Sequence, residues 1–106
     1  MFKVYERSIE LVRGLRPVVE KLARKDRDLA NQIRRAGSSI ALNIAEGNRR
    51  SGKSKTYHFR VAAGSAAEVE AGLEVAVAWG HLEPPEPELE LLDQIRAMLW
   101  RLTHPS

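Results

Sequence analysis

The spacing of apolar residues constrains the fold of this chain more than any other feature of its sequence. In four successive segments, apolar side chains recur at alternating intervals of three and four residues, which places them on one face of an α-helix. The segments are expected at about residues 4–23, 29–47, 51–80 and 89–102. None of them alternates with the period of two residues that a half-buried β-strand requires. Four amphipathic helices with short connections predict an all-α protein, an antiparallel up-and-down four-helix bundle.

Each helix is expected to bury one stripe of side chains against the others. The first, second and fourth stripes comprise Val4, Ser8, Leu11, Leu15, Val18 and Leu22; Leu29, Ile33, Ala36, Ile40 and Ile44; and Leu89, Leu92, Ile95, Leu99 and Leu102. The third helix is rich in alanine and glycine, and its apolar arc spans about 200° on a helical wheel. One neighbouring helix cannot cover so wide an arc. Either three helices of its own bundle surround it, or another subunit covers part of it.

Local signals set the helix boundaries. Pro17 removes one backbone hydrogen bond from the first helix, which predicts a kink near residues 14–17 rather than a break. Asp26 or Asp28 is expected to cap the start of the second helix, and Gly47 with Asn48 is expected to end it. Three prolines between residues 84 and 87 separate the third helix from the fourth.

Length and composition limit the chain to a few classes. At 106 residues it is expected to form one domain, residues 1–106. The absence of cysteine excludes disulfides and thiolate metal sites. The histidines, His58, His81 and His104, are not spaced as metal ligands and are expected to be exposed or to cap helices. Charged residues interrupt every apolar run well before the ~20 residues of a membrane span. We therefore expect a cytoplasmic protein without a metal or other cofactor.

Charge is distributed unevenly along the chain. Residues 1–60 contain 15 Lys and Arg against 6 Asp and Glu, whereas residues 61–106 contain 2 against 8. Between Gly47 and Ala67 there is no acidic residue at all. Such a separation favours either an anionic partner or subunits that meet through oppositely charged surfaces.

Seven cations form the candidate nucleic-acid-binding surface. They are Arg34, Arg35, Arg49, Arg50, Lys53, Lys55 and Arg60. A patch of this kind can contact phosphates electrostatically without reading the base sequence. The alternative is a solvated surface balanced by glutamates elsewhere. In that case Arg34 and Arg35 would be paired with Glu46 or with a neighbouring subunit.

A second set of polar residues lies in apolar helices, where polar groups need hydrogen-bond partners. It consists of Ser38, Ser39, Asn43, Glu46, Ser65 and Glu68. We expect these residues to serve packing and assembly, through hydrogen bonds between helices or between subunits. No arrangement of nucleophile, base and orienting residue stands out. The chain is therefore not expected to be an enzyme.

The string GNRRSGKS, from Gly47 to Ser54, satisfies the phosphate-loop pattern G-x-x-x-x-G-K-[ST]. A true phosphate loop follows a buried strand and opens a helix, so that backbone N–H groups surround the phosphates. The residues before Gly47 have helical spacing rather than the continuous β-branched run of a parallel strand. We interpret the string as a basic turn between two helices that matches the pattern by chance.

Two motifs resemble those of a known bacterial family. The run QIRRAGSSI from residue 32, followed by NIAEG from residue 43, is similar to a signature of the form RRA.SI..NIAEG. That signature is typical of the four-helix-bundle proteins related to those encoded in 23S ribosomal RNA intervening sequences, the S23 family. The later pattern F-x-x-x-A-G-S-x-x-E, from Phe59 to Glu68, looks like the second motif of that family. The resemblance covers nearly the whole chain.

This resemblance implies a homopentameric, barrel-like assembly of four-helix bundles. Some relatives are accessory proteins of diversity-generating retroelements, which implies nucleic acid and a reverse transcriptase as partners. With the basic surface, the resemblance predicts a non-enzymatic homo-oligomer that binds RNA or DNA non-specifically. The alternative is a structural or protein-interaction scaffold that binds no nucleic acid.

Overall fold

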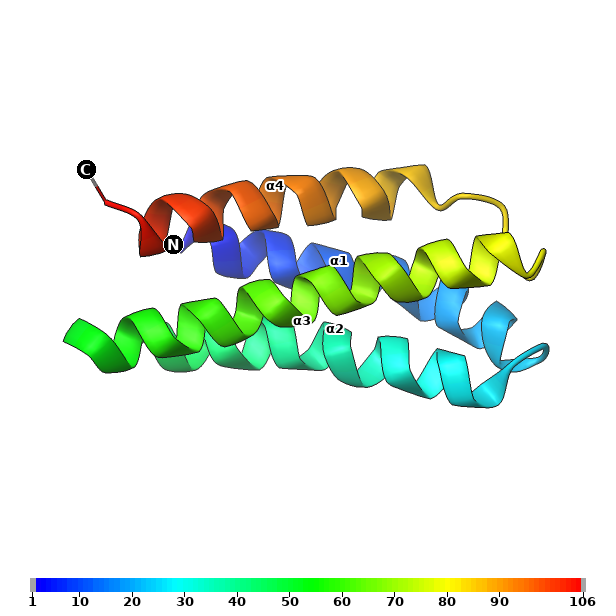
Figure 1. Ribbon diagram of the computed structural model, residues 1–106, viewed down its shortest axis with the longest axis horizontal. Helices are drawn as coiled ribbons and strands as arrows, with labels where there is room; N and C mark the ends of the chain where they lie inside the picture. Colours follow the sequence, from blue (N-terminus) through cyan, green and yellow to red (C-terminus); the bar gives the residue numbers. More distant parts are fainter. Residues whose placement is uncertain (1, 106) are drawn as a thin grey trace.

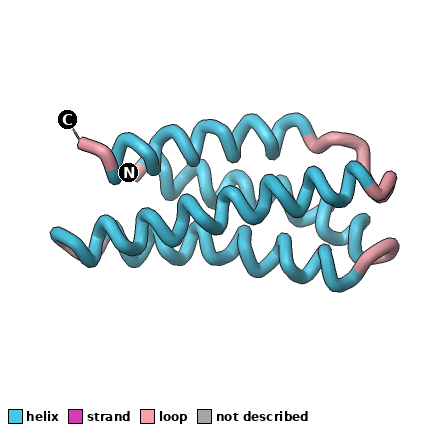
Figure 2. The backbone as a smooth tube through the Cα atoms, viewed as in Figure 1, coloured by secondary structure: helices cyan, strands magenta, loops and turns pink. Residues whose placement is uncertain are grey.

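A computed structural model describes residues 2–105 of the chain. Its helices are α1 (Lys3–Ala23), α2 (Arg27–Asn48), α3 (Gly52–Ala78) and α4 (Glu86–Thr103). Within residues 2–105 there is no strand, as Figure 2 shows. The prediction of an all-α protein with four helices is therefore confirmed. None of the helices in this range is long and apolar enough to cross a membrane.

The helices lie side by side along the 42 Å length of the molecule (Figure 1). α1 packs against α2 and α4, and α3 packs against the same two helices. Successive helices run in opposite directions in Figure 1. As a consequence, the α2–α3 link, the start of α1 and the end of α4 lie at the same end of the bundle.

The core follows the predicted stripes with one shift in α1. Leu11, Leu15 and Leu22 are buried as predicted, but Val19 is buried where the spacing predicts Val18, which is only partly buried. At 100° per residue, Val19 lies about 40° from Leu15 around the helix and Val18 about 60° on the other side. The centre of the buried face of α1 therefore lies closer to Val19 than to Val18.

Near the ends of the bundle, the predicted stripes of α2 and α4 are less completely buried. Leu29 and Leu89 are partly buried and pack against the core, while Leu102 is exposed. The central members of both stripes, Ile33, Ile40 and Ile44 of α2 and Leu92, Ile95 and Leu99 of α4, are buried. The apolar periodicity thus identifies the core face of each helix but overestimates burial at its ends.

The cap at Asp26 is confirmed, and so is the expectation that Pro17 does not break α1. The Asp26 side chain caps α2, because its Oδ1 accepts a hydrogen bond from the backbone N–H of Leu29 at 3.1 Å. Pro17 lies inside α1, which continues from Lys3 to Ala23 without a break. The proline therefore costs α1 a backbone hydrogen bond without dividing it.

α2 ends at Asn48, in agreement with the prediction that Gly47 with Asn48 ends it, although its C-cap is Arg49 rather than a glycine. Gly47 is buried within the helix. A β-carbon added to Gly47 would lie 2.6 Å from Cε1 of Phe59 on α3. The glycine is therefore explained by the close approach of α2 and α3, since any larger residue would collide with the phenyl ring.

One side of α3 remains open in the single chain. Phe59, Ala66 and Leu73 on its core face are buried, whereas Val75 and Trp79 are exposed. The helices that pack against α3 are α2 and α4. One chain therefore covers only part of the wide apolar arc of this helix.

Candidate nucleic-acid interface

The link between α2 and α3 consists of residues 49–51. Gly47 and Asn48 belong to α2, and the last three residues of the string GNRRSGKS belong to the first turn of α3. A helix rather than a strand precedes the string, which confirms its interpretation as a turn between helices. Gly52 has φ of +59°, a conformation that glycine adopts without steric cost. This glycine lets the chain reverse within a short link.

Five cations lie in and beside this link, and we call them the basic end: Arg49, Arg50, Lys53, Lys55 and Arg60. Arg49 and Arg50 follow α2 directly, and the other three lie in the first nine residues of α3. Because a short link joins α2 to α3, these cations, which are close together in sequence, all lie toward one end of the bundle.

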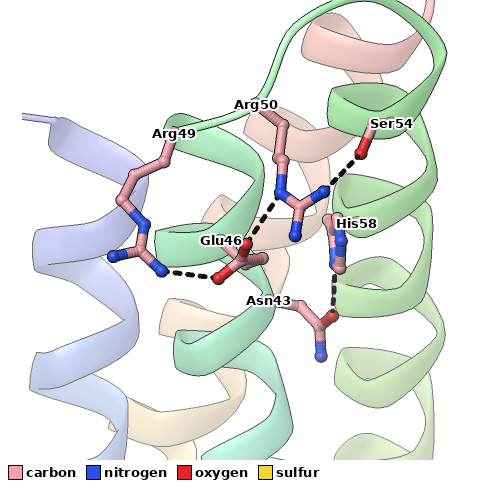
Figure 3. Close-up of polar contacts among 6 residues, drawn as sticks. All are labelled: Asn43, Glu46, Arg49, Arg50, Ser54 and His58. Carbon is pink, nitrogen blue, oxygen red and sulfur yellow. Dashed lines mark hydrogen bonds and ion pairs between the residues drawn. The ribbon is translucent and has the colours of Figure 1, made fainter.

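A single carboxylate, that of Glu46, binds both arginines of the link (Figure 3). Nη2 of Arg49 donates a hydrogen bond to Oε1 of Glu46 at 2.7 Å, and Nε of Arg50 donates to Oε2 at 2.8 Å. These contacts, that of Arg49 first, lower the pKa of Glu46 from 4.5 to about 2. The side chain of Arg49 is still 75% exposed. Glu46 therefore orients the two arginines without covering them.

The ion pairs of Glu46 predict a defined effect of pH on stability. The folded-state pKa lies below the unfolded value, so the pairing stabilises the fold above pH 4.5 and is lost as pH falls from about 4.5 to about 2. In thermal unfolding followed by circular dichroism, Glu46→Gln is expected to lower the melting temperature at pH 7. The difference from the unmodified protein should shrink below pH 4.5. A difference in melting temperature between the two proteins that stays constant from pH 7 to pH 2 would contradict this account.

The remaining cations of the basic end have no carboxylate partner. Among residues 2–105, Lys53, Lys55 and Arg60 form no ion pair. The first turn of α3 contains no acidic residue, and Ser51 makes no side-chain cap bond to it. The unpaired backbone N–H groups of this helix start add positive potential to that of the side chains.

The seven cations predicted to contact phosphate lie in two separate places in the structure. Arg34 and Arg35 lie near the middle of α2, about 21 Å along the helix axis from Arg49 at about 1.5 Å per residue. Arg34 lines a groove between α1 and α2. Glu46 binds Arg49 and Arg50 rather than Arg34 or Arg35. The expected single patch is therefore the basic end alone, with Arg34 and Arg35 outside it.

Between α2 and α3, four polar side chains form a hydrogen-bonded chain that we call the polar seam: Ser39, Asn43, His58 and Ser65. The Ser65 hydroxyl donates to Oγ of Ser39 at 2.8 Å. Nδ2 of Asn43 donates to the carbonyl oxygen of Ser39 at 2.9 Å, and Oδ1 of Asn43 lies 3.0 Å from Nδ1 of His58. Figure 3 shows the last contact next to Glu46. These bonds give the polar side chains partners within the half-buried contact of the two helices.

Two of the residues expected to serve packing lie elsewhere. Ser38 is exposed and lines the groove between α1 and α2, and Glu68 is exposed on α3. Among residues 2–105 neither forms a side-chain hydrogen bond or ion pair. The seam thus joins Ser39, Asn43 and Ser65 of the predicted set, with Glu46 one helical turn beyond Asn43.

His58 is the seam residue that the sequence analysis missed. It was expected to be exposed or to cap a helix, but it is partly buried and contacts Asn43 across the α2–α3 interface. Its distance in sequence from the α2–α3 link, which is similar to that of Asn43, could have identified it. A short link between antiparallel helices places residues at similar distances before and after it opposite each other. His104, in contrast, is the C-cap of α4, as expected of a capping histidine.

Fold and site together define the class: a small four-helix bundle with a polar seam between two helices and a concentration of cations at one end. Within residues 2–105, no group of histidine and acidic side chains could hold a metal ion. The chain belongs to the family of 23S rRNA-intervening sequence proteins, whose model matches residues 1–101. The resemblance inferred from the two sequence motifs is confirmed.

A solved structure has a similar fold. It is the crystal structure of a protein of unknown function from the S23 ribosomal protein family of Bacteroides thetaiotaomicron. The two chains are 21% identical and superpose with a TM-score of 0.84, over 94% of this chain and 97% of that one. At this identity the likeness concerns the fold alone. No curated protein matches the chain.

Proposed function

We propose that this protein is a non-enzymatic, homo-oligomeric bundle that binds RNA or DNA non-specifically through its basic end. The observation that carries the proposal is the charge balance there. Five cations lie in and beside the α2–α3 link. Among residues 2–105, Glu46 provides the one carboxylate that pairs with any of them. Such an excess of exposed positive charge attracts a phosphate backbone without a requirement for base contacts.

The geometry of the paired arginines fits this role. Glu46 accepts one hydrogen bond from each guanidinium, and a guanidinium has five N–H groups. The exposed remainder of Arg49 and Arg50 can still donate to phosphate oxygens. The carboxylate also restrains both side chains at the α2–α3 link, which reduces the conformational entropy that they lose on binding. The pairing is therefore compatible with phosphate binding.

The salt dependence of binding tests the proposal. In a filter-binding titration with a duplex, the slope of log affinity against log salt is expected to be about −0.9 per phosphate contact, or near −4.5 if all five cations of the basic end engage. A single strand is expected to give about −0.7 per contact. Affinity should depend little on base sequence. An absence of measurable binding at low salt would end the proposal.

The open side of α3 supports the homo-oligomeric part of the proposal. Its small residues leave the helix backbone accessible, and a β-carbon added to Gly64 would meet no atom within 4 Å. Val75 is exposed on the same helix. A second copy of the chain would cover this apolar surface, since helices with small side chains approach each other closely. The family resemblance implies five copies.

The second candidate function is a scaffold in which oppositely charged surfaces of neighbouring subunits meet. It is favoured by the acidic surface of the other half of the chain, where Glu70, Glu74, Glu86, Glu90 and Asp93 lie on α3 and α4. In that case the basic end would be covered in the assembly and unavailable to phosphates. Neutralisation of the basic end would then dissociate the oligomer, whereas the nucleic-acid proposal expects the oligomer to persist.

A further inference from the structure

A hollow between α3 and α4, at the end of the bundle that holds the basic end, contains an exposed tryptophan. We propose that this hollow binds an unpaired nucleobase on Trp100, so that the protein prefers single-stranded to duplex nucleic acid. The inference rests on the proposed function, which it deepens by naming the class of nucleic acid. It concerns a surface that lies outside the basic end except for the shared residue Arg60.

Trp100 presents an aromatic surface to solvent. Its side chain is 61% exposed, although it belongs to a helix whose other large apolar residues mostly pack on the core. The His104 ring stacks on it with a centroid distance of 4.3 Å and an interplanar angle of 10°. Nδ1 of His104 also lies 3.0 Å from the carbonyl oxygen of Trp100. One face of the indole is therefore covered and the ring is held, while the exposed remainder is free to stack.

The hollow has the size and lining of a site for a flat molecule. Its volume is about 440 Å³, within the range of about 300–1,000 Å³ typical of small-molecule sites. Ala63 of α3 and Ala97 of α4 contribute only methyl groups beside the indole. Small side chains on both walls leave room for a base to lie against Trp100. Base–aromatic stacking of this kind tolerates any base, because every base has a π-face.

Charged groups at the rim match the other parts of a nucleotide. Arg60 forms no ion pair among residues 2–105 and is available to a phosphate. Arg96 is already bound by Glu70 across the α3–α4 contact. Asp93 can accept a hydrogen bond from the exocyclic amine of a base. An aromatic surface, one free cation and one hydrogen-bond acceptor complement a nucleotide better than they complement a simple anion.

The hollow is also placed where a bound strand would reach it. α3 begins and α4 ends at this end of the bundle (Figure 1). From Lys53 to Arg60 is about 10 Å along α3 at about 1.5 Å per residue. A backbone held by the basic end can therefore continue to Arg60 and present a base to Trp100. A duplex cannot do so without flipping a base out, because the faces of paired bases are stacked on one another.

Trp79 provides a matched control within the same chain. It is 70% exposed and also lies beside a histidine, His81, at a centroid distance of 6.5 Å. It follows the C-terminal end of α3, at the opposite end of the bundle from the basic end. The two tryptophans are alike in exposure and differ in the surrounding charge. A contribution specific to the hollow should therefore appear at Trp100 alone.

The test compares Trp100→Ala, Trp100→Phe and Trp79→Ala for binding to an oligothymidine and to a duplex at low salt. Loss of one stacked base is expected to weaken oligothymidine binding by roughly 10-fold, within a range of about 5- to 150-fold, in Trp100→Ala. Duplex binding should change by less than about 2-fold, a difference that is small on the same scale. Trp100→Phe should retain most of the affinity, and Trp79→Ala all of it. In a Trp79→Phe protein, oligothymidine should quench the fluorescence of Trp100.

The possible outcomes separate the two proposals. If the unmodified protein binds neither nucleic acid, the proposed function fails and the inference with it. If it binds both, and Trp100→Ala loses nothing or loses affinity equally for both, the inference alone is overturned. Dissociation of the oligomer in Trp100→Ala, measured by light scattering, would also overturn it, because Trp100 would then be an anchor between subunits. Selective loss of single-strand binding with an intact oligomer supports it.

Discussion

Phe59→Ala is expected to lower the free energy of unfolding by about 3–5 kcal/mol, the range for removal of a buried phenyl ring. Phe59 is 2% exposed and lies directly against Gly47 of α2. Its ring also contacts that of Phe2, with a centroid distance of 6.1 Å. Gly47 has no side chain that could move into the cavity. The lost contacts would therefore be only partly replaced by relaxation.

The matched control for this change is Tyr57→Ala, two residues earlier on α3. Tyr57 is 63% exposed, so its removal leaves no cavity and should change stability by less than about 0.5 kcal/mol. Both variants can be compared by urea unfolding at one fixed protein concentration, because the stability of an oligomer depends on concentration. Equal effects of the two changes would show that the α2–α3 contact does not hold Phe59 as described. A larger effect of Tyr57→Ala would place Tyr57 in an interface between subunits.

We expect the combined change Arg49→Gln, Lys53→Gln and Lys55→Gln to make duplex binding less dependent on salt. The slope of log affinity against log salt should become less negative by about 0.9 per cation, or about 2.7 in all. Each substitution removes one positive charge and leaves a shorter, uncharged polar side chain. The weakening should be the same for all sequences, since contacts to phosphates carry no sequence information. The measurement is the filter-binding titration described above, with affinities taken at four or more salt concentrations.

A second triple variant, Lys21→Gln, Arg24→Gln and Lys25→Gln, gives the same change in net charge at the opposite end of the bundle. All three of its residues are exposed at or beside the α1–α2 link. This control should leave the slope nearly unchanged. If both variants lose affinity equally, binding depends on overall charge and the basic end is not a distinct surface. If the first variant dissociates the oligomer, the scaffold function gains support instead.

The fold was largely predictable because burial depends on periodicity, which is a property of the sequence alone. The four helices and most of their buried residues follow from spacings of three and four. The errors concern contacts between helices. Whether Val18 or Val19 faces the core depends on how α1 is rotated against its neighbours. Similarly, the need for glycine at position 47 becomes apparent only from the position of Phe59 on α3.

The candidate site was predictable only in part. The cations of the link were identified because residues near one another in sequence remain near one another in space. Arg34 and Arg35 were grouped with them by their angle around α2, but the angle does not express the distance along the helix axis. The polar residues of one helix could be recognised as needing partners. The identity of the partner, His58 for Asn43, required the axial alignment of α2 with α3.

The directions of the hydrogen bonds in the polar seam determine where the proton of His58 resides. The carbonyl oxygen of Ser39 can only accept, so the amide nitrogen of Asn43 must face it and the amide oxygen must face His58. That oxygen also can only accept, so the neutral imidazole is the Nδ1–H tautomer, with a lone pair on Nε2. The hydrogen bonds across the contact between α2 and α3 therefore select one of the two neutral tautomers of this ring.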